Sequence, residues 1–355
     1  MTASKIPATV ELPHCNQITG IFKMPSAQAA IEVAEPAVIH LTDVSPSDKP
    51  WDLLKARADR VAELFRVDPD LSQYSDRVLD CSRWLRFSLA PTAETDECGT
   101  FRHKLTDARF CRVNLCPVCS WRKQLAWRGR FFKAVPKIRE AYPTARWLFV
   151  TLTVANVPIG ELGSAIANMN TAWNRLRNRK TWPALGYFRA LEVTRETQRP
   201  DFAHPHFHAM LLVPASYFSG QNYLKQAQWR EMWRESLRAS YEPSVNVKAV
   251  KPKAVNPDDP NSDGLTEAVL STLAYHVKGA KSSNLYDDPE WFNELFKQMR
   301  RVRTVSVGGA LRDHIREDEP EDLIHLEDVP DEPDNDDVAF WYQWRRDISR
   351  YTMRD

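Results

Sequence analysis

Three histidines occupy alternate positions in the segment HPHFH at residues 204–208. Successive side chains of a β-strand point to opposite faces, so His204, His206 and His208 share one face, while Phe207 points toward a core. Two imidazoles in alternate positions can bind one divalent cation, which is zinc-like or, with oxygen ligands added, manganese or magnesium. We therefore predict a metal site within this histidine triplet rather than histidines without a ligand.

An acidic residue in the preceding apolar segment is a candidate third ligand. Glu192 lies within ALEVT, where a buried carboxylate without a partner would be costly. If segments 186–194 and 204–213 form a hairpin about residue 199, Glu192 lies across from His206. We favour a metal ligand over the alternative, a plain salt bridge with a neighbouring arginine.

A tyrosine and a lysine share one side of the predicted helix LTEAVLSTLAYHVKGA at 265–280. Residues four apart lie on one helical face, so Glu267, Ser271 and Tyr275 form a row. Lys278 follows on the same side. A phenol has a pKa of about 10 and is a poor nucleophile, but a cation and a nearby metal favour the phenolate, which can attack phosphorus. The alternative is an ordinary amphipathic helix.

The cysteines form a second metal-binding pattern. Cys111, Cys116 and Cys119 are spaced C-x4-C-x2-C, which is typical of a zinc knuckle in an intracellular protein. A tetrahedral site needs a fourth ligand. The candidates for it are Cys81, Cys98 and His103. The segments SRWLRFSL and FRHKLTDARF are predicted strands of a hairpin, in which Cys81 lies opposite Cys111 while Cys98 lies at the distant tip. We therefore expect structural zinc on Cys81 and the three knuckle cysteines.

Strands and helices that must position these residues alternate from residue 146 onward. We expect strands at 146–154, 186–194, 204–213 and 244–251, and helices at 161–180, 223–240 and 265–280. Two further helices are expected before them, at 51–66 and 120–139. The order β-α-β-β-α-β-α matches the split βαβ plan of ferredoxin-like and RRM-like folds. The predicted class is α+β: an antiparallel sheet with helices on one face, preceded by a small Cys-rich zinc module.

Charge is segregated along the 355 residues, so the net charge of +1 is misleading. Residues 317–338 hold twelve acidic residues and no Lys or Arg, which leaves the rest of the chain strongly basic. A basic body predicts a polyanionic partner, with nucleic acid first. The predicted helix 120–139 carries candidate phosphate contacts at Arg122, Lys123, Arg128 and Arg130. Its Trp127 is expected in the core.

Composition narrows the class of protein. Hydrophobic residues make up 43% and charged residues 27%, which excludes a fibrous or fully disordered chain. No stretch reaches the ~18 apolar residues of a membrane span, and we predict a cytoplasmic protein without a membrane partner. The expected division is a largely disordered segment at 1–50, a helix, zinc module and basic helix at 51–140, a catalytic domain at 141–312, and an acidic tail with a C-terminal segment at 313–355.

The motifs together resemble a known family. FVTLT (149–153), HPHFH (204–208) and AYHVKG (274–279), in this order, look like the three motifs of the HUH endonucleases. The span from about 77 to 312, with CRVNLCPVCSWRK at 111–123, resembles the plasmid rolling-circle replication initiators of the Rep_1 type. The CSRWLRF context of Cys81 also recurs in that family.

The resemblance implies a metal-dependent nickase and ligase that cuts one strand at its own origin through a covalent 5′-phosphotyrosine. By motif, Tyr275 is the nucleophile, His206 and His208 bind Mn²⁺ or Mg²⁺, and Glu192 is the acidic third ligand. Some members carry a Glu four residues before the Tyr, thought to activate water and end replication. Here that position is Ser271, and Glu267 lies one turn further back.

The implied partners are origin DNA, single-stranded or in a hairpin at the nick site, together with host helicase and polymerase and a second copy of the chain. Two rival functions remain open. One is an HUH transposase or relaxase with the same chemistry. Specificity for the plasmid origin would distinguish a replication initiator from this rival. The other is a non-catalytic zinc-bearing DNA-binding regulator, which would bind DNA without forming a covalent adduct.

Overall fold

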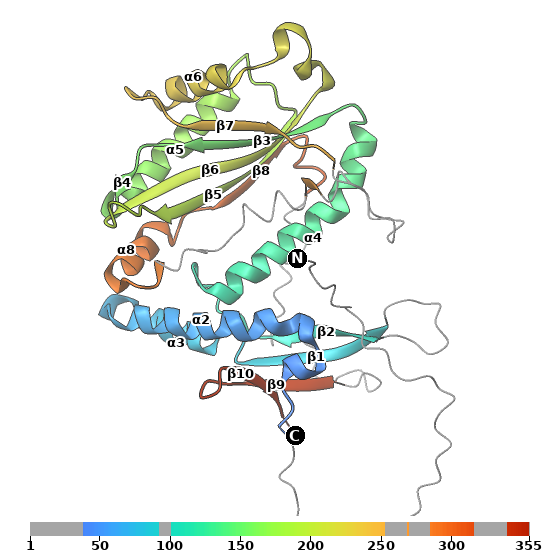
Figure 1. Cartoon of the computed structure of the whole chain (residues 1–355), viewed down its shortest axis with the longest axis vertical. Helices are drawn as coiled ribbons and strands as arrows, with labels where there is room; N and C mark the ends of the chain where they lie inside the picture. The colour runs from blue at the N-terminus through green and yellow to red at the C-terminus, as the bar shows by residue number, and fades with distance from the viewer. Residues whose placement is uncertain (1–37, 92–100, 253–267, 270–284, 316–338, 355) are drawn as a thin grey trace, which may run out of the picture. The chain divides into compact units, whose positions relative to one another are not determined.

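The computed structural model describes residues 38–91, 101–252, 268–269, 285–315 and 339–354 (Figure 1). Its helices are α1 (Leu41–Val44), α2 (Lys49–Arg66), α3 (Ser72–Asp80), α4 (Pro117–Ala141), α5 (Leu162–Arg177), α6 (Gln226–Leu237) and α8 (Pro289–Met299). Its strands are β1 (Trp84–Pro91), β2 (Phe101–Ala108), β3 (Arg146–Thr153), β4 (Val157–Pro158), β5 (Gly186–Arg195), β6 (Phe202–Val213), β7 (Val245–Ala249), β8 (Val305–Gly309), β9 (Ala339–Arg345) and β10 (Arg350–Met353). Two antiparallel sheets with helices confirm the α+β class.

The chain forms two compact units, which are described separately. Among the described residues, the first unit contains 38–59, 79–111 and 339–354, and the second contains 60–78 and 112–315 with their gaps. The predicted four-part division of the sequence stays a prediction. Among the described helices, none combines the length and the apolar composition that crossing a bilayer requires.

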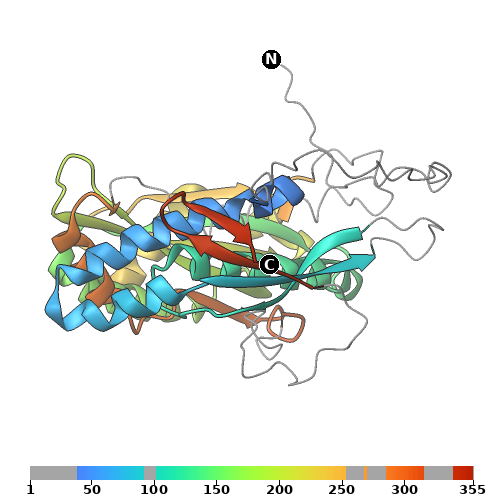
Figure 2. The same ribbon diagram turned by 90° about the horizontal axis from the view of Figure 1, so that it is seen from below.

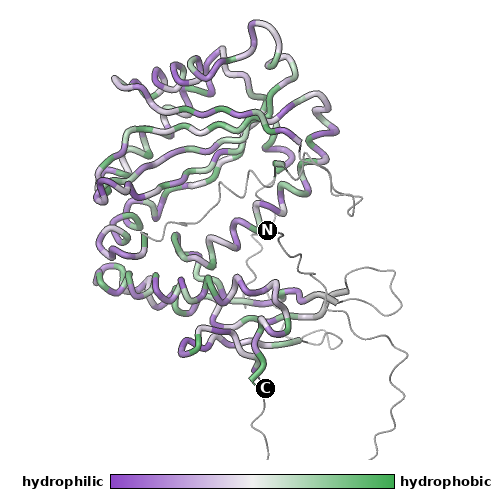
Figure 3. Tube along the Cα trace, in the orientation of Figure 1, coloured by the Kyte–Doolittle hydropathy of each residue, from purple (hydrophilic) through white to green (hydrophobic). Residues whose placement is uncertain are grey.

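The second unit is built on a sheet of order β7-β3-β6-β5-β8, with β4 paired to β6. Alternation along its strands sends one set of side chains, including Leu148, Phe207 and Leu211, into a core with α5 and α6. Both helices show the alternating hydrophilic and hydrophobic colouring of amphipathic elements (Figure 3). Trp173 of α5 and Trp233 of α6 are buried in this core. These two helices therefore cover one face of the sheet, as the sequence predicted.

The opposite face of this sheet is also covered, which corrects the prediction of helices on one face only. Phe188 and Met210 point to that side, where they form a second core with Phe131, Val135 and Ile138 of α4. The three apolar side chains of α4 recur at helical spacing, so they form one stripe. A sheet face with large apolar side chains must be buried, and α4 supplies the cover.

The first unit contains a four-stranded sheet of order β10-β9-β1-β2. β9 and β10 come from the C-terminal end of the chain, and β9 pairs with β1 (Figure 2). α2 binds this hairpin through buried polar contacts: Asp59 accepts a 2.8 Å hydrogen bond from the Trp344 indole, and Asp52 accepts one of 3.0 Å from the Tyr351 amide. α2 therefore covers one face of this sheet. Sequence analysis did not predict β9 or β10.

Candidate metal centre

The β5–β6 hairpin brings Glu192 and two histidines together. Glu192 pairs with His206 in the ladder, as predicted, and His208 follows two residues later on the same face. The neighbouring Phe207 is buried on the opposite face. Strand alternation and hairpin register therefore place the carboxylate and both imidazoles on one side of the sheet.

The ligand atoms of this group converge. Glu192 Oε2 lies 3.1 Å from His206 Nε2 and 2.8 Å from His208 Nε2. Two ligands at right angles on an octahedral ion, each about 2.1 Å from it, are about 3.0 Å apart. The spacing therefore fits a divalent cation bound by one carboxylate and two imidazoles. The three residues could hold a metal ion.

The other nitrogen of each imidazole has a partner that orients the ring. His206 Nδ1 lies 3.2 Å from the His204 carbonyl, and His208 Nδ1 lies 3.2 Å from Thr151 Oγ1. The Phe149 ring also stacks on His208, at 5.6 Å between centroids. In the tautomers that donate from Nδ1, both Nε2 lone pairs remain free for a metal, which is the usual arrangement around metal-binding histidines.

Electrostatics keep the carboxylate ionised. Burial raises the pKa of Glu192. When His206 and His208 instead carry their protons on Nε2, their hydrogen bonds to the carboxylate outweigh burial and lower that pKa to about 2. A metal ion would therefore meet a charged oxygen at neutral pH.

The third histidine of the triplet belongs to a different network. His204 Nδ1 lies 2.5 Å from Asn156 Oδ1, and Asn156 donates a 2.6 Å hydrogen bond to Glu196. Burial, followed by the charge of His206, lowers the pKa of His204. Sequence analysis missed the role of Thr151, which lies within FVTLT, and that of Asn156, which lies three residues after this segment.

The predicted catalytic residues Glu267, Tyr275 and Lys278 lie outside the described residues, as does Ser271. Two residues of their segment are described, and one of them, Val269, is fully buried with Phe188 and Met210.

Tyr286 follows Tyr275 by eleven residues, and its ring contacts that of Phe292 in a tilted arrangement with 6.0 Å between centroids.

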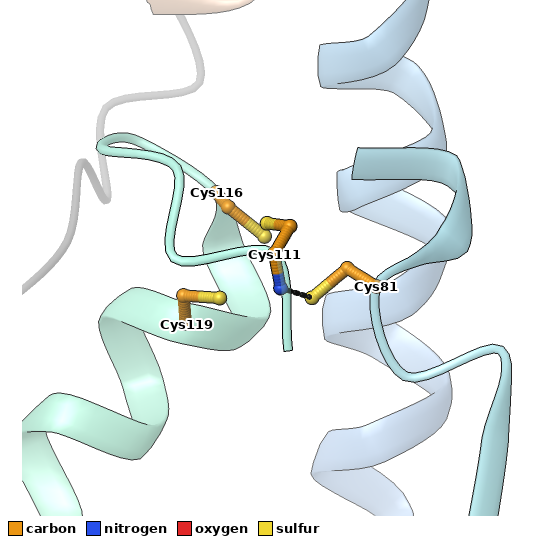
Figure 4. A group of neighbouring side chains, drawn as sticks. All are labelled: Cys81, Cys111, Cys116 and Cys119. Atoms are coloured by element: carbon orange, nitrogen blue, oxygen red, sulfur yellow. Dashed lines mark hydrogen bonds between the residues drawn. The ribbon is translucent and has the colours of Figure 1, made fainter. Parts of the chain in front are cut away.

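Four cysteines form a second group that could hold a metal ion (Figure 4). The sulfurs of Cys81, Cys111, Cys116 and Cys119 all lie within 4.8 Å of one another. Thiolates about 2.3 Å from a tetrahedral zinc ion are about 3.8 Å apart, so the spacing fits such a site. Cys111 N–H also donates to Cys81 Sγ at 3.5 Å. The choice of Cys81 as fourth member agrees with this grouping.

The two other candidates for the fourth ligand differ in what is known of them. His103 is half-buried on β2, where its ring packs against Phe87 and Phe340. Burial lowers the pKa of His103. Cys98 lies outside the described residues.

The cysteine knuckle starts α4, which carries the predicted DNA contacts. Cys116 is the N-cap residue of α4. Arg128 is exposed, whereas Arg122, Lys123 and Arg130 are half-buried. Trp127 packs edge-on against Phe188 at 5.3 Å, which agrees with its predicted place in the core.

Comparison with known proteins agrees with these motifs. The family model Rep_1, described as "Replication protein", matches residues 102–352. A "Protein rep" of Streptococcus pneumoniae serotype 2 is 30% identical over 305 residues, which cover 83% of this chain and 89% of that protein. A "Protein rep" of Bacillus amyloliquefaciens is 30% identical over 329 residues, covering 86% of this chain and 94% of that protein. No solved structure gives a significant match. The chain therefore belongs to the Rep_1 family of plasmid replication proteins.

Proposed function

We propose that this protein initiates rolling-circle replication by nicking one strand of its plasmid origin and later rejoining it. The observation that carries the proposal is the convergence of Glu192, His206 and His208 on a strand hairpin in a Rep_1 chain. One carboxylate and two imidazoles suit Mn²⁺ or Mg²⁺ in a mixed nitrogen and oxygen shell. We further assign the sheet of the second unit to the split βαβ type of ferredoxin-like and RRM-like folds.

In this proposal Tyr275 is the nucleophile. Its phenolate oxygen attacks the phosphorus, the bond from phosphorus to O3′ breaks, and O3′ takes up a proton to become a free hydroxyl. The phosphoryl group remains on the tyrosine as a 5′ ester. Attack by a 3′ hydroxyl on this ester rejoins the strand without ATP. Bound Mn²⁺ or Mg²⁺ would neutralise the charge that develops on the non-bridging oxygens.

The buried position of Val269 supports this role for Tyr275. Val269 packs against Phe188 and Met210, which point to the same face of the sheet as the metal group. Tyr275 follows six residues later in the same predicted helix. We propose that Lys278 positions the phosphate or the phenol, and that Glu267 is the candidate for activating water at termination.

Two further sites complete the proposal. The four clustered cysteines would hold structural zinc. Four basic side chains of α4 would contact DNA phosphates, namely Arg122, Lys123, Arg128 and Arg130. The freed 3′ hydroxyl requires a host polymerase, and unwinding of the plasmid requires a host helicase.

A covalent-trapping experiment tests the reaction class. The protein is incubated with a single-stranded oligonucleotide of its plasmid's origin, labelled at the 3′ end, with Mn²⁺ or with EDTA. We expect a denaturant-resistant protein–DNA band with Mn²⁺ and none with EDTA. A zinc-bearing regulator would bind the oligonucleotide without forming this band. A transposase or relaxase would form it without preferring the origin of this plasmid.

A further inference from the structure

A pocket of about 600 Å³ lies in the first unit. Its lining includes Arg83, Trp84, Asp107, Arg109, Trp341 and Arg354, together with Asp80, which lies 3.9 Å from Arg83 and 3.2 Å from Arg109 in ion pairs. Its volume is within the usual range for sites that enclose small organic groups. None of the roles assigned above uses these residues.

The pairing of the strands places the pocket on the face of the sheet turned away from the buried core. Arg86 of β1 pairs with Trp341 on one side and with Asp107 on the other, so these three side chains share a face. The adjacent pair, Leu85 and Tyr342, is fully buried on the opposite face. The sheet therefore has one apolar face and one face of aromatic and charged groups.

The two tryptophans on the open face lie next to cations. The Arg354 guanidinium is 5.2 Å from the centre of the Trp84 ring, and the Arg86 guanidinium is 5.7 Å from that of Trp341. Trp341 keeps 39% of its surface exposed. Exposed rings beside arginines are the usual means of holding unpaired bases and their phosphates.

Asp107 is an unusual acid for such a pocket. It is only 2% exposed, and its Oδ1 has no hydrogen-bond partner among the described residues. Burial raises the pKa of Asp107, and the charge of Arg86 opposes that effect. A buried acceptor without a donor costs free energy, which a ligand with N–H donors would recover.

We propose that this pocket binds one unpaired base of single-stranded DNA, stacked on Trp84 or Trp341, with the base edge donating to Asp107 and its phosphates bound by the arginines. The inference rests on the proposed function, because nicking needs an unpaired strand. Guanine fits best, since its Watson–Crick edge carries two adjacent N–H donors for one carboxylate, whereas thymine has one. A duplex does not fit, because its bases are stacked and paired.

Binding of labelled oligonucleotides to the full chain, measured by fluorescence anisotropy, tests the proposal without any nicking. The probes are a 15-thymine strand, the same strand with one central guanine, an abasic version of the latter, and a duplex. We expect the guanine strand to bind most tightly. Equal affinity for the abasic strand would overturn the proposal.

Variants assign the binding to the pocket. Trp341→Ala should weaken binding of the guanine strand about tenfold, as for one lost stacking partner, and Trp341→Phe should restore most of it. Asp107→Asn should abolish the preference for guanine over thymine. Unchanged affinity in Trp341→Ala, in a protein that melts like the wild type, would contradict the proposal.

A matched pair of arginines tests the phosphate contacts. Arg354→Ala should lower the slope of log affinity against log salt by about 0.7, the value for one phosphate contact on a single strand. Arg57→Ala removes the same charge from an exposed position on α2 and should leave the slope unchanged. Equal effects of the two changes would show that only general charge matters.

The covalent-trapping experiment separates this inference from the proposed function. If the wild type forms the adduct and the pocket variants bind normally, only the pocket proposal fails. If no adduct forms while the pocket variants still lose affinity, the nickase proposal fails and the pocket stands.

Discussion

Glu192 and His206 face each other across the β5–β6 ladder, and the carboxylate Oε2 lies 3.1 Å from the imidazole Nε2. The same oxygen also faces His208 at 2.8 Å. One short hairpin thus supplies all three candidate ligands. Changes to the group, or to the residues that orient it, should therefore alter metal affinity while leaving the fold intact.

Glu192→Gln should weaken Mn²⁺ binding by at least tenfold, because an isosteric amide removes the negative charge from the group. Isothermal titration calorimetry with Mn²⁺ measures the affinity. Glu242→Gln is the matched control, since Glu242 has a side chain that is 78% exposed in an ion pair with Arg230. Equal affinities in the two variants would remove Glu192 from the site.

Thr151→Val should weaken Mn²⁺ binding about tenfold or more, although Thr151 is not a ligand. The change removes the oxygen that lies 3.2 Å from His208 Nδ1, so the ring loses its fixed orientation. Thr171→Val on α5 makes the same substitution at an exposed position and should have no effect. If both variants bind Mn²⁺ like the wild type, Thr151 does not position His208.

The cysteine group makes a prediction about zinc content. Cys81→Ser and Cys111→Ser should each lower the bound zinc measured by mass spectrometry, reduce the soluble yield and weaken origin binding, because metal binding contributes folding free energy. Cys98→Ser should be mild. A loss of zinc in Cys98→Ser with none in Cys81→Ser would show that the fourth ligand was chosen wrongly.

Removing the hydroxyl group should affect the stability of the protein differently at two buried tyrosines of the first unit. Tyr351 donates a 2.6 Å hydrogen bond to the Ser82 carbonyl, so Tyr351→Phe should lower the free energy of unfolding by about 1 kcal/mol. Tyr342 is fully buried, and its hydroxyl has no hydrogen-bond partner among the described residues. Tyr342→Phe should therefore be neutral or stabilising. Urea unfolding at pH 8 measures both.

Tyr342→Phe should also change how the stability of the protein responds to alkaline pH. Burial raises the pKa of Tyr342 to about 12. The folded state thus holds this proton more tightly than the unfolded chain, in which the pKa is about 10. The resulting stability is complete below pH 10 and is lost as the pH rises toward 12. Wild type should lose more stability than Tyr342→Phe over that interval, and parallel pH profiles would contradict this.

The metal group was predictable because its determinants are local. HPHFH and ALEVT lie in consecutive strands, so alternation and one turn position fix the pairing of Glu192 with His206. The cysteine hairpin was predictable for the same reason. Thr151 was harder to assign, since its contact with His208 depends on the pairing of β3 with β6 rather than on spacing.

The remaining features depend on contacts that are distant in the sequence. The segment 339–345 alternates like a strand, but nothing near it indicates that Trp341 pairs with Arg86. The pocket in the first unit could therefore not be foreseen. The apolar stripe that Phe131 and Val135 form on α4 is visible in the sequence, but nothing near it indicates that the stripe packs on the second face of the sheet.

The most direct test of the central claim is covalent trapping with tyrosine variants. Single-stranded origin DNA and Mn²⁺ are incubated with wild type, Tyr275→Phe and Tyr286→Phe, and the adduct peptide is identified by mass spectrometry. Tyr275→Phe should retain metal content and DNA affinity but form no adduct, and Tyr286→Phe should nick normally. His206→Ala should also lose nicking, but with partial rescue by excess Mn²⁺, which Tyr275→Phe cannot show. An adduct in Tyr275→Phe that disappears in Tyr286→Phe would contradict the nucleophile assignment, and unchanged nicking in both tyrosine variants would contradict the phosphotyrosine mechanism itself.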